Sequence, residues 1–119
     1  MNTKEELAAA ARKKFKTEEV DLGGGVKLTL RELTPSERKA LDDRLWKKNP
    51  DGTFFKDEKG FNHVNTGVHY AEEWIAACVS PALTVADLLT DDWPDSLKEE
   101  LKDKARKLCG FTVEDAAKN

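Results

Sequence analysis

The sequence predicts a mainly α-helical α+β domain, a compact bundle of about four to five helices with a small β-hairpin near the N-terminus. Apolar residues recur at helical spacing in several separate segments. A Gly-Gly-Gly turn separates two alternating segments, and helix-capping residues precede most of the helical ones. With 119 residues, the chain fits a single domain, residues 1–119, with one hydrophobic core.

The composition points away from several functional classes. Charged residues make up 36% of the chain, yet the net charge is only -3. Because the two signs are interspersed, general affinity for nucleic acid is not favoured. Cys78 and Cys109 are too few for a disulfide scaffold, so we expect reduced thiols. No signal peptide and no apolar run long enough for a membrane span are present, and we expect a cytoplasmic protein.

Residues 4–16 are predicted to form the first helix. Leu7, Ala11 and Phe15 recur every fourth residue, and Thr3 is placed to cap the helix start. Four basic residues crowd the last turn, where they complement the partial negative charge of a helix C-terminus. A basic docking arm is the functional alternative for this segment.

Residues 19–32 are predicted to form a β-hairpin. Apolar and polar residues alternate on both sides of the glycine triplet 23–25. A phosphate cradle is the other interpretation of three adjacent glycines. It is disfavoured because no Gly-Lys-Ser/Thr follows and the next element is a strand, not a helix.

A second helix is predicted at residues 35–48. Thr34 and Glu37 have the spacing of a capping box, and Pro35 suits the first helical position. The proline at position 50 disfavours helical backbone in the residue before it, so the helix should end there.

The central helix is predicted at residues 68–79, the least polar helical segment of the chain. Tyr70, Trp74 and Cys78 recur at a spacing of four, with Ile75 beside them, so the helix has a wide apolar face. The other predicted helices and the hairpin are expected to pack over this face.

Residues 49–67 lack helical periodicity and are rich in turn formers. Phe54, Phe55 and Phe61 make this segment unusual, because loops of this length are commonly mobile or functional. The segment is an aromatic loop or a small hairpin. Its phenylalanines either fold back as a lid on the core or form a partner-binding surface.

The C-terminal part predicts a short helix at 85–90, a long helix at 95–109 and a terminal turn at 113–118. Glycine at position 110 should end the long helix. The predicted core residues, taken from all the helices, are Leu41, Leu45, Tyr70, Trp74, Ile75, Cys78, Leu97, Leu101 and Leu108.

Catalytic and metal-binding motifs are not recognisable. Four acids at 87, 91, 92 and 95 lack calcium-loop spacing and suit a helix N-terminus instead. His63 and His69 have no ligand partner at zinc-site spacing. We therefore expect a protein that is not an enzyme, with no cofactor and no metal site.

Two segments together resemble the tail assembly chaperones of long-tailed bacteriophages, which are encoded ahead of the tape measure protein. Residues 25–38, GVKLTLRELTPSER, are similar to that family's strand and acid-rich helix start. Residues 93–119, from Trp-Pro to the ending EDAAKN, are similar to its closing helix and terminus. Cys109 stands where an asparagine is more usual, and the aromatic loop has no counterpart.

The resemblance implies a non-catalytic chaperone that binds the tape measure protein, helps recruit tail tube subunits and is absent from the mature virion. Such a protein must cover apolar stripes of a long helix weakly enough to be displaced. The alternatives are a structural component of the particle, such as a minor tail or head-tail joining protein, and a small nucleic-acid-binding regulator. The predicted contact residues are Leu7, Ala11, Phe15, Phe54, Phe55 and Phe61.

Overall fold

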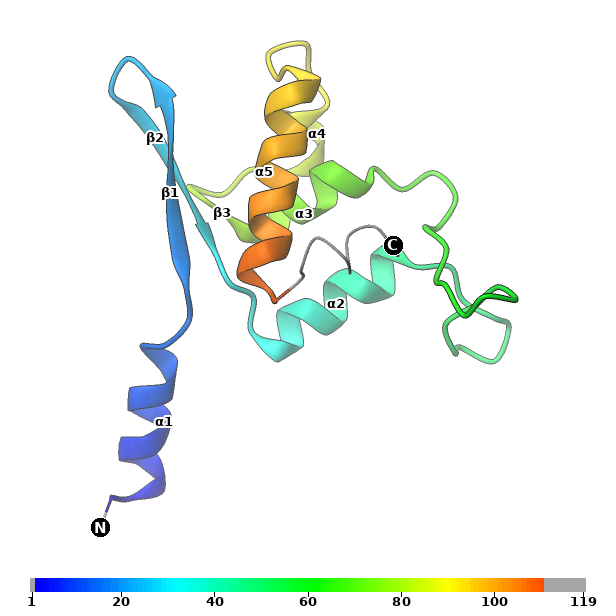
Figure 1. Cartoon of the computed structure of the whole chain (residues 1–119), viewed down its shortest axis with the longest axis horizontal. Helices are drawn as coiled ribbons and strands as arrows, with labels where there is room; N and C mark the ends of the chain where they lie inside the picture. Colours follow the sequence, from blue (N-terminus) through cyan, green and yellow to red (C-terminus); the bar gives the residue numbers. More distant parts are fainter. Residues whose placement is uncertain (1, 111–119) are drawn as a thin grey trace.

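Five helices and one three-stranded antiparallel sheet form the part of the chain that the computed structural model describes, residues 2–110 (Figure 1). The predicted α+β class is confirmed. The predicted turn at 113–118 lies outside the described residues. In chain order the elements are α1 (Lys4–Arg12), β1 (Thr17–Gly23), β2 (Val26–Arg31), α2 (Pro35–Leu45), α3 (Tyr70–Cys78), β3 (Val79–Ser80), α4 (Val85–Leu88) and α5 (Asp95–Leu108).

Helix α3 is the centre of the hydrophobic core. It packs against α5, α2, α4 and strand β2. Trp74, Ile75 and Cys78 of α3 are fully buried, and so are Leu41 and Leu45 of α2. Burying a side chain of this size contributes about 1.5 to 3 kcal/mol, so these residues dominate the stability of the fold. The core also contains Val20, Leu28, Leu30, Leu33, Trp46, Val79, Leu88, Leu101 and Ala105, with Tyr70, Leu97 and Leu108 partly buried against it.

Strands β1 and β2 form the hairpin that the alternating pattern predicts. Val20 lies opposite Leu28, and both side chains are buried. The turn needs its three glycines, since residues 23–25 all have positive φ, at 95°, 61° and 78°. At the tip of the hairpin, beyond the core, Leu22 and Val26 are exposed.

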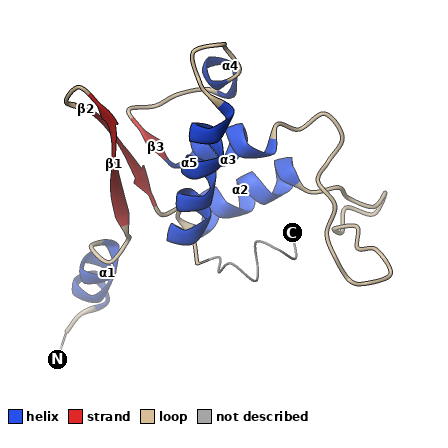
Figure 2. Cartoon of the chain, turned by 45° about the horizontal axis from the view of Figure 1, so that its top comes forward, coloured by secondary structure: helices blue, strands red, loops and turns tan. Residues whose placement is uncertain are grey.

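Strand β3 was not predicted from the sequence. The apolar pattern extends the central helix to residue 79, but the helix ends at Cys78 and Val79 adopts an extended conformation. Val79 and Ser80 pair with the middle of β2, with Val79 opposite Leu30. The two-residue strand gives β2 a second neighbour and attaches the hairpin to the helical core (Figure 2).

All five helices are shorter than predicted: α3 begins two residues later, at Tyr70, α4 ends two residues earlier, at Leu88, α5 ends one residue earlier, and α1 and α2 lose three or more residues at their ends. Helix α1 ends at Arg12, so Phe15 lies in the connection to β1. Helix α2 ends at Leu45, three residues early, because Trp46 takes an extended conformation and pairs with Val64. The β-bridge at Trp46 therefore ends the helix, before the proline at position 50 can do so.

The predicted start of α2 is confirmed. The hydroxyl of Thr34 accepts a hydrogen bond from the backbone N–H of Glu37 at 3.2 Å, and the Glu37 carboxylate accepts from the N–H of Thr34 at 3.0 Å. Glu37 also accepts two bonds from Arg31 at 2.8 and 2.7 Å. These bonds lower the pKa of Glu37 to about 2, and the bond from Arg31 contributes most to the shift.

A buried ion pair joins three helices. The Lys98 ammonium of α5 lies 2.8 Å from the Glu72 carboxylate of α3 and donates to the carbonyl of Leu88 in α4 at 3.2 Å. Both charged side chains are only 11% and 12% exposed. The carboxylate raises the pKa of Lys98, which keeps the lysine charged in its buried position.

Two segments project from this core on opposite sides, α1 and the loop between α2 and α3 (Figure 1). The radius of gyration is 16.4 Å, whereas a fully compact chain of this length has about 13 to 14 Å. The larger value agrees with the open outline in Figure 1, where α1, this loop and the tip of the hairpin extend from the core. Among the described residues, no helix has both the length and the apolar character needed to cross a membrane.

Candidate partner-binding surfaces

The aromatic loop, predicted at residues 49–67, is ordered from Trp46 of the core cluster to Asn65 by backbone hydrogen bonds. Three β-bridges order it: Trp46 with Val64, Lys48 with Phe54, and Lys56 with Asn62. The Lys56–Asn62 bridge closes a turn at 57–60, and the Lys48–Phe54 bridge closes a separate turn at 50–52. Each turn contains a glycine with positive φ, Gly52 at 90° and Gly60 at 83°.

The phenylalanines of the loop do not form a lid on the core. Phe54 is 38% exposed and Phe61 40% exposed, Phe55 is half-buried, and none of the three belongs to the core cluster. Val64 is exposed as well, at 38%. Apolar groups left outside the core on an ordered segment are typical of a binding surface.

Lysine side chains partly cover two of these rings. The Lys48 ammonium lies 5.4 Å from the ring centroid of Phe54, and the Lys47 ammonium lies 4.6 Å from that of Phe55. Such cation–π contacts at exposed sites contribute about 0.5 to 1 kcal/mol each. The lysines therefore shield the rings in the free protein and can be displaced by an apolar partner.

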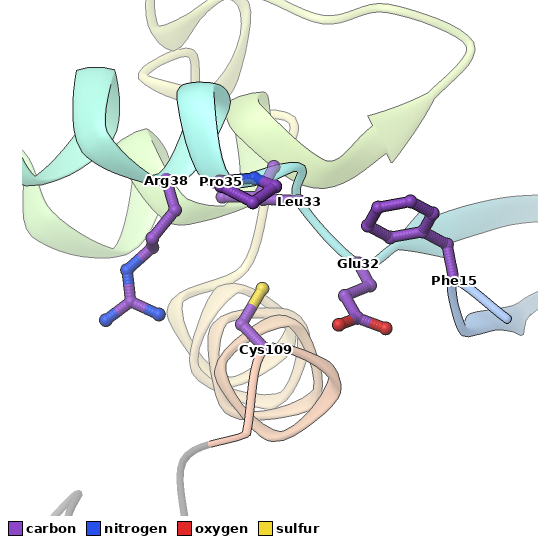
Figure 3. A pocket seen from close by; sticks show the side chains of 6 residues that line it. All are labelled: Phe15, Glu32, Leu33, Pro35, Arg38 and Cys109. Atoms are coloured by element: carbon purple, nitrogen blue, oxygen red, sulfur yellow. The ribbon is translucent and has the colours of Figure 1, made fainter. Parts of the chain in front are cut away.

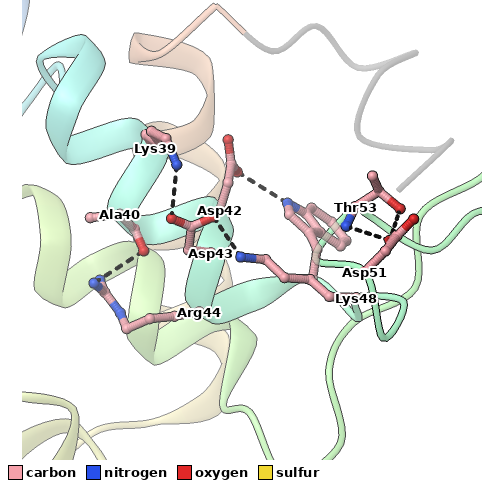
Figure 4. A network of polar contacts seen from close by, with 9 residues as sticks. Lys39, Ala40, Asp42, Asp43, Arg44, Lys48, Asp51 and Thr53 are labelled. Carbon is pink, nitrogen blue, oxygen red and sulfur yellow. Dashed lines mark hydrogen bonds and ion pairs between the residues drawn. The ribbon is translucent and has the colours of Figure 1, made fainter.

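Helix α2 positions the loop through its acidic residues (Figure 4). Asp43 lies 2.9 Å from the Lys48 ammonium and 3.2 Å from that of Lys39. Both contacts lower the pKa of Asp43, that with Lys48 being the larger cause. Asp42 accepts a hydrogen bond from the Trp46 indole at 3.0 Å. The first residues of the loop are thus fixed to the helix that precedes it.

A histidine–aspartate pair fixes the far turn of the loop. His63 Nε2 lies 2.9 Å from the Asp57 carboxylate, and the His63 ring packs edge-on against Phe55 at 5.3 Å. Hydrogen bonds from His63 and then from the Phe61 N–H lower the pKa of Asp57. The pair is a surface contact that orients Phe55 and Phe61.

The arm, α1 and the connecting residues 13–15, is the second exposed apolar surface. Helix α1 contributes no buried residue. Leu7 is 58% exposed, Phe15 is 38% exposed, and Ala11 is exposed too. The helix is nonetheless well formed: Thr3 caps its start as predicted, and Glu6 completes a capping box with it. Its stability comes from caps and helix propensity, so its apolar stripe is available to a partner.

A groove of about 270 Å³ lies between the arm, α2 and the end of α5 (Figure 3). Cys109 lines it together with Phe15, Glu32 and Arg38. A hydrogen bond between the Cys78 and Cys109 thiols lowers the pKa of Cys109 and raises that of the buried Cys78. None of the residues that line the groove is a histidine.

Metal-binding clusters are not found in the described part of the chain, where no group of three or more histidine, cysteine or acidic side chains converges. His69 occupies the N-cap position of α3, but its side chain makes no capping hydrogen bond.

The six residues predicted to contact a partner fall into two separate groups. The arm and the aromatic loop lie at opposite ends of the molecule in both views (Figures 1 and 2), so they form two surfaces and not one. Sequence reasoning missed Val64 and the two lysines at 47 and 48. The adjacent lysines directly before an aromatic segment are the signal that could have indicated shielded rings.

Comparisons of the chain with models of protein families, with curated proteins and with solved structures found no match. Function is therefore inferred from the geometry of the two surfaces and from the resemblance of residues 25–38 and 93–119.

Proposed function

We propose that this protein is a non-catalytic tail assembly chaperone of a long-tailed bacteriophage. It binds the tape measure protein in the host cytoplasm, helps recruit tail tube subunits, and leaves before the virion is complete. The sequence resemblance supplies the class of protein. The observation that carries the proposal is the aromatic loop, an ordered segment with exposed apolar groups outside the core.

The loop suits a weak contact with a long helix. Phe54, Phe61 and Val64 are each 38% to 40% exposed, and one lysine lies over the ring of Phe54. An amphipathic helix offers apolar side chains at regular spacing, which a few such groups can contact. Because the contact area is small, tube subunits that enclose the tape measure protein can displace the chaperone.

The charge distribution argues for a protein partner over nucleic acid. Four of the five basic residues of α2 and its exit, Arg38, Lys39, Arg44 and Lys48, each lie within 3.4 Å of a carboxylate, and the fifth, Lys47, lies over the Phe55 ring. Cations that are already paired release few counterions from a phosphate backbone. We therefore expect no gel shift with duplex DNA at moderate salt.

The proposal is tested by co-purification with the tape measure protein of the same phage. We expect the tagged chain to retain it, and the double variant Phe54→Ser/Phe61→Ser to lose most of it. The matched control is Leu22→Ser/Val26→Ser, which removes two exposed apolar side chains at the hairpin tip and should bind normally. Failure of the unaltered chain to retain the tape measure protein would contradict the proposal.

Mass spectrometry of purified virions separates the chaperone from the structural alternative. A chaperone that leaves during assembly is absent from the particle, whereas a minor tail or head-tail joining protein is present in a fixed copy number.

A further inference from the structure

We propose that Cys109 is a reactive thiol which, on oxidation by a low-molecular-weight disulfide, forms a reversible disulfide bond with Cys78. The inference is independent of the proposed function because it depends only on the contact between α3 and α5. Both cysteines are free thiols in the structure. Cys78 is the last residue of α3, Cys109 directly follows α5, and the two helices pack against each other.

The fold brings the two sulfur atoms together from distant positions in the chain. Cys78 is fully buried in the core, and Cys109 packs against the core cluster that contains it. The two thiols form a hydrogen bond with each other. The backbone N–H of Cys109 donates to the Ala105 carbonyl at 3.2 Å, which fixes this end of α5. Two cysteines whose side chains already meet can be joined with little movement of the backbone.

Of the two thiols, that of Cys109 can be reached from solvent. Cys109 is half-buried and lines the groove of about 270 Å³, whereas Cys78 is fully buried. Figure 3 shows the Cys109 sulfur directed from the end of α5 toward Leu33, with the side chains of Arg38 and Glu32 on either side of it in this view. A small disulfide that enters the groove therefore meets Cys109 first.

The surroundings of Cys109 favour its thiolate. The hydrogen bond with Cys78 and a second one from the Leu33 backbone N–H lower the pKa of Cys109. The charge of Arg38 lowers this pKa further, whereas partial burial and the Glu32 carboxylate raise it. The pKa of Cys78 is raised. Because the thiolate is the form that attacks a disulfide, Cys109 should react before Cys78.

The reaction is a thiol–disulfide exchange in two steps. The Cys109 thiolate attacks one sulfur of the reagent, so that a new S–S bond forms, the S–S bond of the reagent breaks, and the first half leaves as a thiolate that takes up the Cys109 proton. The Cys78 sulfur then attacks the Cys109 sulfur, and the second half leaves and takes up the Cys78 proton. The two cysteines are oxidised by two electrons, and the reagent is reduced to two thiols.

Intact-mass measurement of the folded chain after treatment with hydroxyethyl disulfide and acid quenching tests the inference. The unaltered chain should lose two hydrogen atoms and retain no part of the reagent. Cys78→Ala should retain one half of the reagent on Cys109, because the second thiol is missing. Cys109→Ala should react at least about tenfold more slowly than Cys78→Ala, because its remaining thiol is buried.

Two controls separate reactivity from misfolding. Circular dichroism shows whether each variant is folded, and Cys78→Val replaces Cys78→Ala if the smaller side chain unfolds the chain. In urea, where burial is lost, Cys78→Ala and Cys109→Ala should react at similar rates. The inference would be overturned by an unaltered chain that keeps an adduct on Cys109, or that reacts only in urea. Equal rates for the two folded variants would overturn it too.

The bond should also stabilise the fold. It closes a loop of roughly 30 residues, which restricts the unfolded chain, so the oxidised chain should melt about 10 °C higher than the reduced chain. Dithiothreitol should reverse the difference. An oxidised chain that melts at the same or a lower temperature would overturn the inference, because the folded core would then not accommodate the bond.

Discussion

The core around α3 and the two projections use the same residue types under opposite conditions. In the core, Trp74 is fully buried, and the charged pair of Lys98 with Glu72 is enclosed by three helices. In the aromatic loop, Phe54 stays exposed and a lysine lies over its ring in contact with water. Apolar residues therefore stabilise this fold only where they pack into the common core of helices and sheet, and those of the two projections contribute little to it.

The largest effect is expected from the centre of the core. Trp74→Ala removes a fully buried aromatic side chain over which the Arg38 guanidinium lies at 5.1 Å. The cavity and the lost burial should lower the free energy of unfolding by about 3 to 5 kcal/mol. Urea denaturation followed by circular dichroism measures the change. An unaltered midpoint would show that α3 is not the centre of the fold.

The next largest effect is expected from the buried ion pair. Lys98→Met leaves the Glu72 carboxylate buried without its partner and removes a donor from the Leu88 carbonyl. The melting temperature should fall by about 10 °C. Replacing both residues, with Glu72→Gln and Lys98→Met together, should recover part of this loss. If the double variant is no better than the single one, the pair is not the cause.

A smaller effect is expected from Glu37 at the start of α2. Its pKa is lowered from 4.5 to about 2, so its stabilising contribution is complete above about pH 4.5 and is lost as the pH falls toward 2. Because Glu37 and Arg31 are 39% and 41% exposed, solvent screening limits the contribution to about 1 kcal/mol. Glu37→Gln should therefore be less stable at pH 7 and equal to the unaltered chain near pH 2. Parallel urea titrations at several pH values measure the difference.

The smallest effect on stability is expected from the projections. Phe54→Ser/Phe61→Ser should change the free energy of unfolding by only about 0.5 to 1 kcal/mol, because both side chains lie outside the core and the main loss is the cation–π contact between Lys48 and Phe54. Thermal denaturation checks this value. A large loss of stability would place the loop with the core and would end the distinction between the two regions.

The sequence predicted the elements that depend on local chemistry. The helix start at Thr34, the glycine turn of the hairpin and the glycine after α5, with φ of 92° at Gly110, all follow from side chains within a few residues of one another. The apolar spacing on α3 also identified Trp74, which is fully buried.

Features that depend on distant partners were not predictable. Strand β3 exists because Val79 meets Leu30, which lies 49 residues earlier in the chain. Helix α2 ends early because Trp46 pairs with Val64, and no local signal indicates this. The sequence gives Leu7 and Phe54 as apolar, but whether they join the core is a property of the whole fold.

The two ends of the aromatic loop lie side by side, and this bears on how the binding specificity of such a protein can change during evolution. Lys47 donates its N–H to the His63 carbonyl at 2.8 Å, and Asn65 donates to the Leu45 carbonyl at 2.7 Å. The chain therefore leaves and re-enters the helical body at one point. A segment with such neighbouring ends can be exchanged for another of different length and composition while Trp46 and α3 stay in place. Recognition can then diverge between related proteins faster than the scaffold that carries it.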